Sequence, residues 1–531
     1  MYKLRAAVLA ALCVLVVTAV TAQGANNQLI ISNGAEPQSL DPSLIQGVPE
    51  TNIYIALFEG LMRYDAKTGL GQPGLATSFT VSADKLVYTF KLRESVWSDG
   101  TPVTAQTVVD SWLRTLDPTT GSQYAYMIGM VVKGADAYNT SSEKDAAKLK
   151  ALRDAVAIKA LDAKTFQMTL TGPAPYVSDM LTHQAFAVLP MHAIAKYGKE
   201  WTKPGNFVGN GAYVLKDWKP QQQITVVKNE KYWDKANVFI PSIEFLPIED
   251  MSTSYQKYKN GEIDWVNNQA FPSANIDEAK LRKDYQVAPQ VATYYYIFNV
   301  TKKPVSDVRV RKAMAMALNT KELVAKVTKG GELMATSISP ALPGYTPAAG
   351  NGYNVAAAKK LLAEAGFPDG KGFPKLTVLY NTNERHKIIA EWVQQQWKTQ
   401  LGIEVELQNM EWKTFLDVRS KQHDFVICRA GWVGDYQDPN TFLDMFITGS
   451  GNNDGLYSSK KYDDLVHLAA TQTGATRMKT LHDAEEILMT KDQAVAPFFF
   501  YVNQDLIDLS KWTGWYPTPN GFHPYVGMKH K

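Results

Sequence analysis

The sequence predicts an α/β protein with two lobes that close as a clamp, and three observations support this fold class. The chain has 531 residues, more than one hydrophobic core usually supports, so two or three domains are expected. Helical and strand patterns alternate along residues 306–407, which is typical of an α/β layer. No internal repeat or long Gly/Ser linker interrupts the chain, and domains joined without a flexible linker tend to move as rigid bodies about a hinge.

The first half of the chain is expected to form short elements. Ile53, Leu57 and Leu61 recur at helical spacing after Thr51, a residue suited to cap a helix. Thr104 is expected to cap another helix after a tight turn at 97–100. In chain order, the other expected elements are a strand at 28–32, a helix at 51–61, a strand at 86–92, a charged surface helix at 143–155 and a strand at 224–227.

The second half is expected to contain longer helices between short strands. Gly366 and Pro368 end one of these helices, because glycine favours the helix C-terminus and proline cannot continue a helix. The expected helices lie at 306–318, 355–365 and 384–401, and the expected strands lie at 375–380 and 403–407.

An apolar run at 425–428 predicts a buried strand that is followed by turn-prone residues. This pattern is expected to set Arg429, Trp432 and Asp435 close together beside a cavity. Opposite charges next to an aromatic wall could hold a small zwitterion. The alternative is a strand end with an ordinary surface ion pair, which is the usual explanation for an isolated Arg and Asp.

Residues 1–22 are expected to be a cleaved signal peptide. Lys3 and Arg5 precede an apolar core at 6–20, and small residues at 20–22 suit cleavage before Gln23. The core is shorter than the ~20 residues that span a bilayer. Cys13 lies inside this core, so a lipid anchor is not expected.

Composition after cleavage argues against several partners. Loss of Lys3 and Arg5 lowers the formal net charge from +3 to +1, so there is no reason to propose nucleic acid or an anionic membrane as a partner. Cys428 is then the only cysteine, and no intrachain disulfide is expected.

Enzyme motifs are not found. The eight histidines form no His-Glu-x-x-His pattern, and no Gly-x-Ser-x-Gly elbow occurs. Cys428 lies in an apolar strand, where a nucleophilic thiolate is disfavoured. With 52 acidic residues, carboxylate pairs for glycoside hydrolysis stay open as an alternative.

Several motifs occur in an order that resembles the periplasmic oligopeptide-binding proteins of ABC importers, which are family 5 extracellular solute-binding proteins. The resemblance covers the chain from about residue 30 to near its C-terminus. Its motifs are Gly-Val-Pro-Glu at 47–50, Leu-Phe-Glu-Gly-Leu at 57–61, Trp-Ser-Asp-Gly-Thr-Pro-Val-Thr-Ala at 97–105, Asn-Gly-Ala-Tyr at 210–213, Asp-Val-Arg-Val-Arg at 307–311, Lys-Lys-Leu-Leu-Ala-Glu-Ala-Gly-Phe at 359–367, Glu-Trp-Lys-Thr-Phe-Leu-Asp at 411–417 and Arg-Ala-Gly-Trp at 429–432 with Asp435.

The resemblance implies a two-lobed periplasmic binding protein fold of type II, cluster C, with an extra α/β domain and a hinge of two crossing strands near residues 290 and 502. The implied division of the chain is lobe I at 23–58, 185–290 and 503–531, an additional domain II at 59–184, and lobe III at 291–502.

The resemblance also implies ligand-binding roles. Asp435 receives the α-ammonium of a peptide, although it could instead cap the helix after Pro439. Arg429 and His386 receive the terminal carboxylate, each for a different peptide length. The other positions that match family contact positions are Val48, Tyr124, Trp412, Arg419, Gly431, Trp432 and Tyr501.

Four positions depart from the family pattern. Gln46 and Ile297 replace acidic residues, so a weaker preference for lysine-rich peptides is expected. Val433 replaces a cysteine that forms a disulfide in many members. Thr328 replaces a lysine used for the shortest ligands, which puts dipeptide binding in doubt.

The implied function is capture of peptides of about three to five residues in the periplasm and delivery to ABC transporter permease subunits. The protein is expected to be a monomer without cofactor, metal or enzymatic activity. The alternatives are binding of murein peptides, haem, nickel or dipeptides and, from other classes, a periplasmic hydrolase or a holdase.

Overall fold

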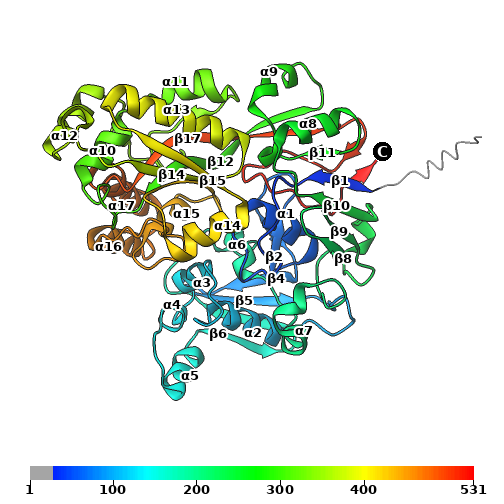
Figure 1. Cartoon of the computed structure of the whole chain (residues 1–531). Helices are drawn as coiled ribbons and strands as arrows, with labels where there is room; N and C mark the ends of the chain where they lie inside the picture. Colours follow the sequence, from blue (N-terminus) through cyan, green and yellow to red (C-terminus); the bar gives the residue numbers. More distant parts are fainter. Residues whose placement is uncertain (1–27) are drawn as a thin grey trace, which may run out of the picture.

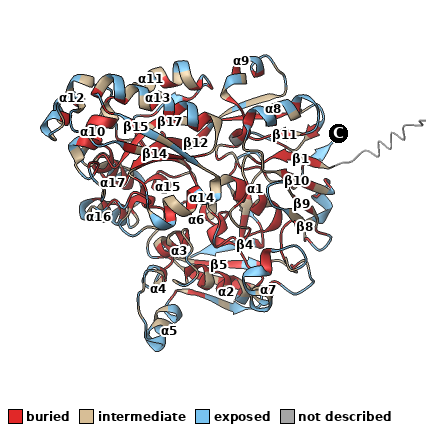
Figure 2. Ribbon diagram, viewed as in Figure 1, coloured by how far each residue is buried: buried red, intermediate tan, exposed pale blue. Residues whose placement is uncertain are grey.

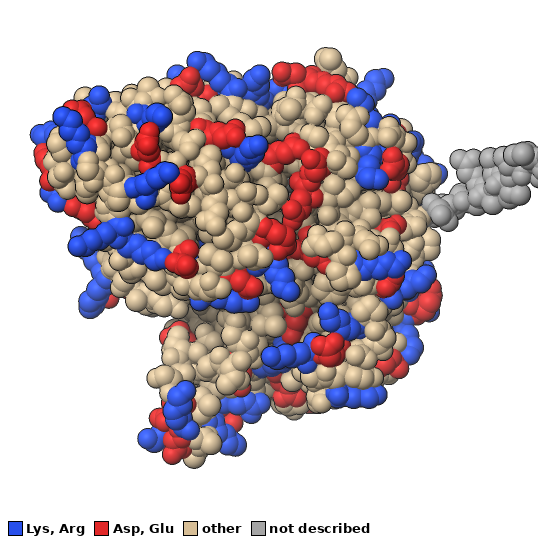
Figure 3. Space-filling model, viewed as in Figure 1, with Lys and Arg blue, Asp and Glu red and all other residues tan. Residues whose placement is uncertain are grey.

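The computed structural model of the chain describes residues 28–531, apart from the side chain of Gln269. The expected signal peptide at 1–22 and its cleavage before Gln23 lie outside the described residues. Within 28–531, no helix has both the length and the apolar character needed to cross a bilayer. On the face drawn in Figure 3, Lys and Arg side chains are interspersed with Asp and Glu side chains, as the small net charge predicts.

One large mixed sheet runs through the molecule (Figure 1). Its strand order is β15-β14-β16-β12-β17-β11-β1-β10-β9-β8, with β13 paired to β17 off this path. The strands are β1 Leu29–Ser32, β8 Tyr213–Lys219, β9 Gln223–Lys228, β10 Ser242–Leu246, β11 Trp265–Val266, β12 Tyr285–Phe298, β13 Leu333–Met334, β14 Leu376–Asn381, β15 Val405–Met410, β16 Ile427–Val433 and β17 Val495–Ile507.

Two long strands connect the halves of this sheet. β12 and β17 pair antiparallel from Tyr285 opposite Leu506 to Ile297 opposite Val495, with irregular register after Pro289. At one end β17 pairs with β11, and at the other end β12 pairs with β16. The extended segments expected near residues 290 and 502 are therefore β12 and β17.

A separate four-stranded antiparallel sheet forms the lower part of Figure 1. Its order is β4-β5-β7-β6. Helix α2 (Ala105–Leu116) begins at Thr104, whose hydroxyl accepts the Thr107 N–H at 3.3 Å, so the predicted cap is confirmed. The other elements of this part are β2 Met62–Tyr64, β3 Gly71–Pro73, β4 Ala76–Val81, β5 Val87–Leu92, α3 Ala125–Val131, α4 Ala135–Asn139, α5 Ala146–Asp154, β6 Ile158–Asp162, β7 Thr165–Thr169 and α6 Val177–Met180.

The C-terminal half carries long helices beside the strands around β14. Helix α13 (Glu384–Leu401) has the predicted bounds, because Asn383 caps its first turn and Gly402 adopts the left-handed conformation that ends it. The other main helices of this half are α10 Val308–Met316, α12 Val355–Glu364, α14 Trp412–Leu416, α15 Asn440–Leu443, α16 Lys460–Ala469 and α17 Gly474–Glu486. Three helices precede it in the chain, α7 Met191–Tyr197, α8 Met251–Lys259 and α9 Ile276–Ala279.

Two local predictions are wrong. The helix expected at 51–61 is α1 (Val48–Leu57), which begins three residues earlier because Pro49 suits the first turn. Thr51 therefore lies inside the helix and does not cap it. The residues after Cys428 do not form a turn, because β12 pairs with β16 along its whole length to Val433.

Burial follows the layers of the fold. Figure 2 shows the strands mostly buried, whereas α5 projects into solvent, as its charged sequence predicts. One hydrophobic cluster contains residues from both the four-stranded part and the C-terminal half. Across this junction the rings of Tyr176 and Tyr436 stack at 4.9 Å. The two parts therefore pack against each other.

Asp505 is expected to make stability pH-dependent. Its buried carboxylate accepts hydrogen bonds from Trp265 Nε1 at 2.9 Å and Asn268 N at 3.2 Å, and burial raises its pKa to about 7. The folded protein binds this proton more tightly than the unfolded chain, whose Asp pKa is about 4. The stabilisation is therefore complete below pH ~4 and is lost as pH rises through ~7.

The Asp505→Asn variant checks this expectation, because it cannot titrate. Thermal melts of both proteins between about pH 4 and pH 8 should show the wild type losing on the order of 4 kcal/mol relative to the variant as pH rises. A constant difference in melting temperature across this range would show that Asp505 does not titrate there.

Candidate ligand-binding cleft

A cavity of about 1090 Å³ lies between the N-terminal segments and the C-terminal half. All twelve predicted site residues line it: Gln46, Val48, Tyr124, His386, Trp412, Arg419, Arg429, Gly431, Trp432, Val433, Asp435 and Tyr501. The binding role of each residue stays a prediction.

Asp435 is buried and held by its own lobe. Its backbone N–H donates to Thr441 Oγ1 at 3.1 Å, and Trp432 Nε1 donates to the same oxygen at 3.3 Å. The helix after Pro439 takes its hydrogen bond from Asp438, which accepts the Asn440 N–H at 2.9 Å. Asp435 therefore lies beside the cavity without serving as that cap.

Asp435 has one close side-chain neighbour of interest. His183 Nε2 lies 3.3 Å from Asp435 Oδ1, and both side chains are less than a tenth exposed. Within 28–531, no Lys or Arg pairs with this carboxylate. Its negative charge is therefore not compensated by a permanent cation.

Arg429 is buried on β16 and is also without a charged partner. Its guanidinium donates to Asn381 Oδ1 at 3.1 Å and to Tyr501 Oη at 2.9 Å, and it lies 5.1 Å from the centre of the Tyr294 ring. No carboxylate pairs with it in the described part of the chain. An ordinary surface ion pair between Arg429 and Asp435 is thus wrong for this structure.

Gly431 lets the guanidinium lie along the strand. A Cβ at this position would come within 2.9 Å of Tyr501 Oη and 3.0 Å of Arg429 Nη2. A side chain at 431 would have to displace both groups from the cavity wall.

The other two basic candidates differ from Arg429. Burial first, and then the charges of Arg429 and Arg385, hold the pKa of His386 well below its usual range, so this imidazole is neutral at pH 7. Arg419 is paired with Asp454 at 2.8 Å. Among the predicted carboxylate receivers, Arg429 therefore carries the uncompensated positive charge.

Contacts across the cleft join the two sides at Trp412. Trp412 Nε1 donates to Glu50 Oε1 at 3.1 Å, and Gln38 Nε2 donates to Asp417 Oδ1 at 3.2 Å. A Cβ at Gly47 would come within 2.5 Å of Trp412. The close approach of Trp412 to the N-terminal segment therefore requires glycine at position 47.

β16 presents an open edge to this region. Its pairing with β14 is confined to Ile427 and Cys428, while β12 occupies its other edge as far as Val433. Among the described strands, none pairs with the β14 side of β16 beyond Cys428. The main-chain groups of residues 429–433 that face away from β12 are therefore available to pair with an extended ligand.

Sequence reasoning missed several residues that line the cavity. His183, Gln184, Asn381 and Asn452 are among the polar ones at its wall, and Gln184 Oε1 is buried without a hydrogen-bond partner among the described residues. No local motif marks them. They reach the cavity because segments distant in sequence meet there.

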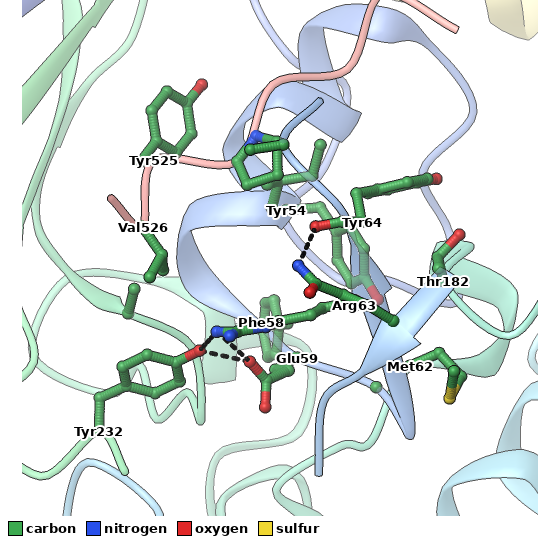
Figure 4. A pocket seen from close by; sticks show the side chains of 16 residues that line it. Tyr54, Phe58, Glu59, Met62, Arg63, Tyr64, Thr182, Tyr232, Tyr525 and Val526 are labelled. Carbon is green, nitrogen blue, oxygen red and sulfur yellow. Dashed lines mark hydrogen bonds and ion pairs between the residues drawn. The ribbon is translucent and has the colours of Figure 1, made fainter. Parts of the chain in front are cut away.

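A second cavity of about 600 Å³ lies beside α1 (Figure 4). Its charged groups are paired with neighbouring side chains: Arg63 donates to Tyr232 Oη at 3.1 Å and to Asp234 at 3.0 Å, while Glu59 accepts from Trp233 Nε1 at 2.7 Å and from the Tyr232 hydroxyl. This charge pairing contrasts with the uncompensated charges of Arg429 and Asp435.

A two-lobed α/β fold with a polar cavity between its lobes is typical of an extracellular solute-binding protein. The chain belongs to the bacterial extracellular solute-binding proteins, family 5, whose family model (middle part) matches residues 71–454. The predicted family and fold class are thereby confirmed.

The chain is similar to the periplasmic oligopeptide-binding protein OppA of Salmonella typhimurium, with 39% identity over 92% of this chain and 89% of that protein. A crystal structure of Haemophilus influenzae OppA in complex with RPPGFSPFR matches with a TM-score of 0.89 and 33% identity, over 95% of this chain and 99% of the other.

The third relative defines the arrangement of the lobes. A structure of the Escherichia coli murein tripeptide binding protein MppA matches with a TM-score of 0.88 at 35% identity, over 95% of this chain and 98% of that one. The unliganded open form of MppA, at the same identity and covering 95% and 97%, gives only 0.62. The lobes of this structure are therefore not in the open arrangement of MppA.

Proposed function

We propose that the protein captures short peptides in an extended conformation between its lobes and delivers them to the permease of an ABC transporter. One observation carries the proposal: the buried charges of Asp435 and Arg429, neither matched by an opposite permanent charge, flank the open edge of β16. A free peptide brings an ammonium group, a carboxylate and a main chain that can pair with a strand edge.

The length of the open edge supports a peptide of about three to five residues. A strand rises ~3.3 Å per residue, so the edge from Arg429 to Val433 is ~13 Å long, about the length of four extended residues. Main-chain pairing gives affinity that does not depend on side chains, whereas the terminal charges select free ends.

The relatives support the remaining parts of the proposal. OppA of Salmonella typhimurium and of Haemophilus influenzae are named for oligopeptide binding, and the former is named periplasmic. By analogy, this protein acts in the periplasm as a monomer after removal of residues 1–22, binds without catalysis, and closes its lobes by rotation about β12 and β17. The proposed division is 23–58, 185–290 and 503–531 for lobe I, 59–184 for domain II and 291–502 for lobe III.

Murein peptides are the second candidate ligand, because MppA is as similar in fold as the oligopeptide binders. A cell-wall peptide with a blocked amino end would leave Asp435 without an ammonium partner. Retention of affinity by an Asp435→Ala variant would therefore favour murein peptides over free oligopeptides.

The experiment that tests the proposal is native mass spectrometry of the mature protein, unfolded and refolded to remove carried-over ligand, with a mixture of dipeptides to hexapeptides. Retention of intact tripeptides to pentapeptides is the expected result. Absence of binding, or the appearance of fragments, would contradict it and direct attention to modified peptides or hydrolysis.

Gln46 should limit affinity for basic peptides. It lines the cavity, and its side-chain Oε1 is buried without a partner among the described residues, so the wall offers an amide where an acidic residue is expected from the family pattern. Gln46→Glu should strengthen binding of tri-lysine relative to tri-alanine by several-fold at low salt. Calorimetric titration measures both, and an unchanged ratio would show that position 46 does not face the peptide side chains.

A further inference from the structure

The Asp435–His183 contact joins two segments that face each other across the cleft. His183 precedes a short helical turn at Gln184–Phe186, whereas Asp435 follows β16 in the C-terminal half. Their side chains are 2% and 8% exposed, and Nε2 of the imidazole lies 3.3 Å from Oδ1 of the carboxylate. Both residues line the cavity.

The local structure fixes which ring nitrogen carries the proton. His183 Nδ1 accepts the backbone N–H of Ala185 at 3.2 Å, so Nδ1 has no hydrogen of its own. The proton of the neutral ring is therefore on Nε2, the ring nitrogen that lies 3.3 Å from Asp435 Oδ1 without being aligned for a hydrogen bond in this structure. The Tyr124 ring, 4.5 Å from the imidazole and 6.0 Å from Trp432, holds the ring plane in place.

This arrangement places an uncharged ring beside the carboxylate without neutralising it. An imidazole with a bare Nδ1 carries no net charge. A Lys or Arg at position 183 would instead compensate the negative charge of Asp435. Oδ1 lies 3.3 Å from His183 Nε2, and Oδ2 has no hydrogen-bond partner in residues 28–531. Oδ2 of this carboxylate is therefore available to a cation.

We propose that His183 is a positioning residue for Asp435 and that the subsite for the peptide's α-ammonium is complete only when the two sides of the cleft meet. The proposal rests on the proposed function. Opening of the lobes separates His183 from Asp435, so the free carboxylate loses its orientation. Recognition of the amino end is thereby coupled to closure.

Two variants separate positioning from a structural role. In His183→Gln the amide nitrogen lies near the place of Nε2 and can donate to Asp435, but the acceptor for Ala185 is lost. In His183→Asn the side-chain oxygen lies near the place of Nδ1 and can accept from Ala185, but no donor reaches Asp435. If the role of His183 is structural, the Asn variant should retain peptide affinity better. If His183 positions Asp435, the Gln variant should retain it better.

The measurement is the dissociation constant of refolded, ligand-free protein for tri-alanine and for N-acetyl-tri-alanine, by calorimetry. His183→Asn should weaken binding of tri-alanine by about tenfold or more, the usual effect of losing a hydrogen bond to a charged group. His183→Gln should stay within about threefold of wild type. Neither variant should change the affinity for the acetylated peptide, and in an Asp435→Asn background neither should have a further effect.

His192→Asn is the matched control, because His192 forms an exposed pair with Asp99 at 2.7 Å away from the cavity, and it should bind as the wild type does. Equal losses for both peptides, a Gln variant as weak as the Asn variant, or unchanged binding of tri-alanine by His183→Asn would overturn the proposal. If wild-type protein binds neither peptide, the proposed function itself has failed, and the two failures are thus distinguished.

Discussion

Asp435→Asn should weaken binding of a free tripeptide by about 30- to 4000-fold, because loss of one partner of a buried charge pair costs about 2–5 kcal/mol. The substitution keeps the shape of the side chain and removes only its charge. In the closed cavity the peptide's ammonium group would then be buried without an opposite charge. Calorimetric titration with tri-alanine measures the loss.

The acetylated peptide supplies the control for this variant. N-acetyl-tri-alanine has no ammonium group, so its affinity should differ little between wild type and Asp435→Asn. The ligand-free variant should also melt no lower than the wild type, since the carboxylate it replaces has no Lys or Arg partner in the described residues. Equal weakening of both peptides would instead indicate a disturbed fold around Thr441.

The fold was predictable where a segment carries its own start and stop signals. Helix α13 has its predicted bounds because Asn383 and Gly402 mark its ends. α1 was misplaced because Pro49 was not recognised as a first-turn residue. The strand after Cys428 was underestimated because its continuation depends on pairing with β12, a contact that the local sequence does not encode.

The cavity was predictable mainly through family resemblance. Residue patterns alone placed only Arg429, Trp432 and Asp435 together, and the other nine lining residues came from matched motifs. Neither approach indicated that Asp454 compensates Arg419 or that His183 approaches Asp435. These contacts join segments that meet only in the folded chain, so the balance of charge in the cavity required the structure.

Removal of the positive charge of Arg429 should weaken recognition of the peptide's terminal carboxylate. Arg429→Met should weaken binding of a free tripeptide or tetrapeptide by about 30- to 4000-fold, because the terminal carboxylate would be buried without a cation. The affinity for C-terminally amidated peptides should change little in this variant, because they carry no terminal carboxylate. Arg429→Lys should fall between, since lysine keeps the charge but not the two-pronged geometry of the guanidinium.

Peptide length distinguishes Arg429 from the neutral His386. The loss in Arg429→Met should be largest for one length and smaller for peptides whose carboxylate ends nearer His386, so a series from tripeptide to pentapeptide should give a length-dependent ratio to wild type. The ligand-free variant should be at least as stable to heat as the wild type, because an unpaired buried charge has been removed. A uniform loss across free and amidated peptides of all lengths would show that Arg429 acts through the cavity wall, by way of Tyr501 and Asn381, rather than through the carboxylate.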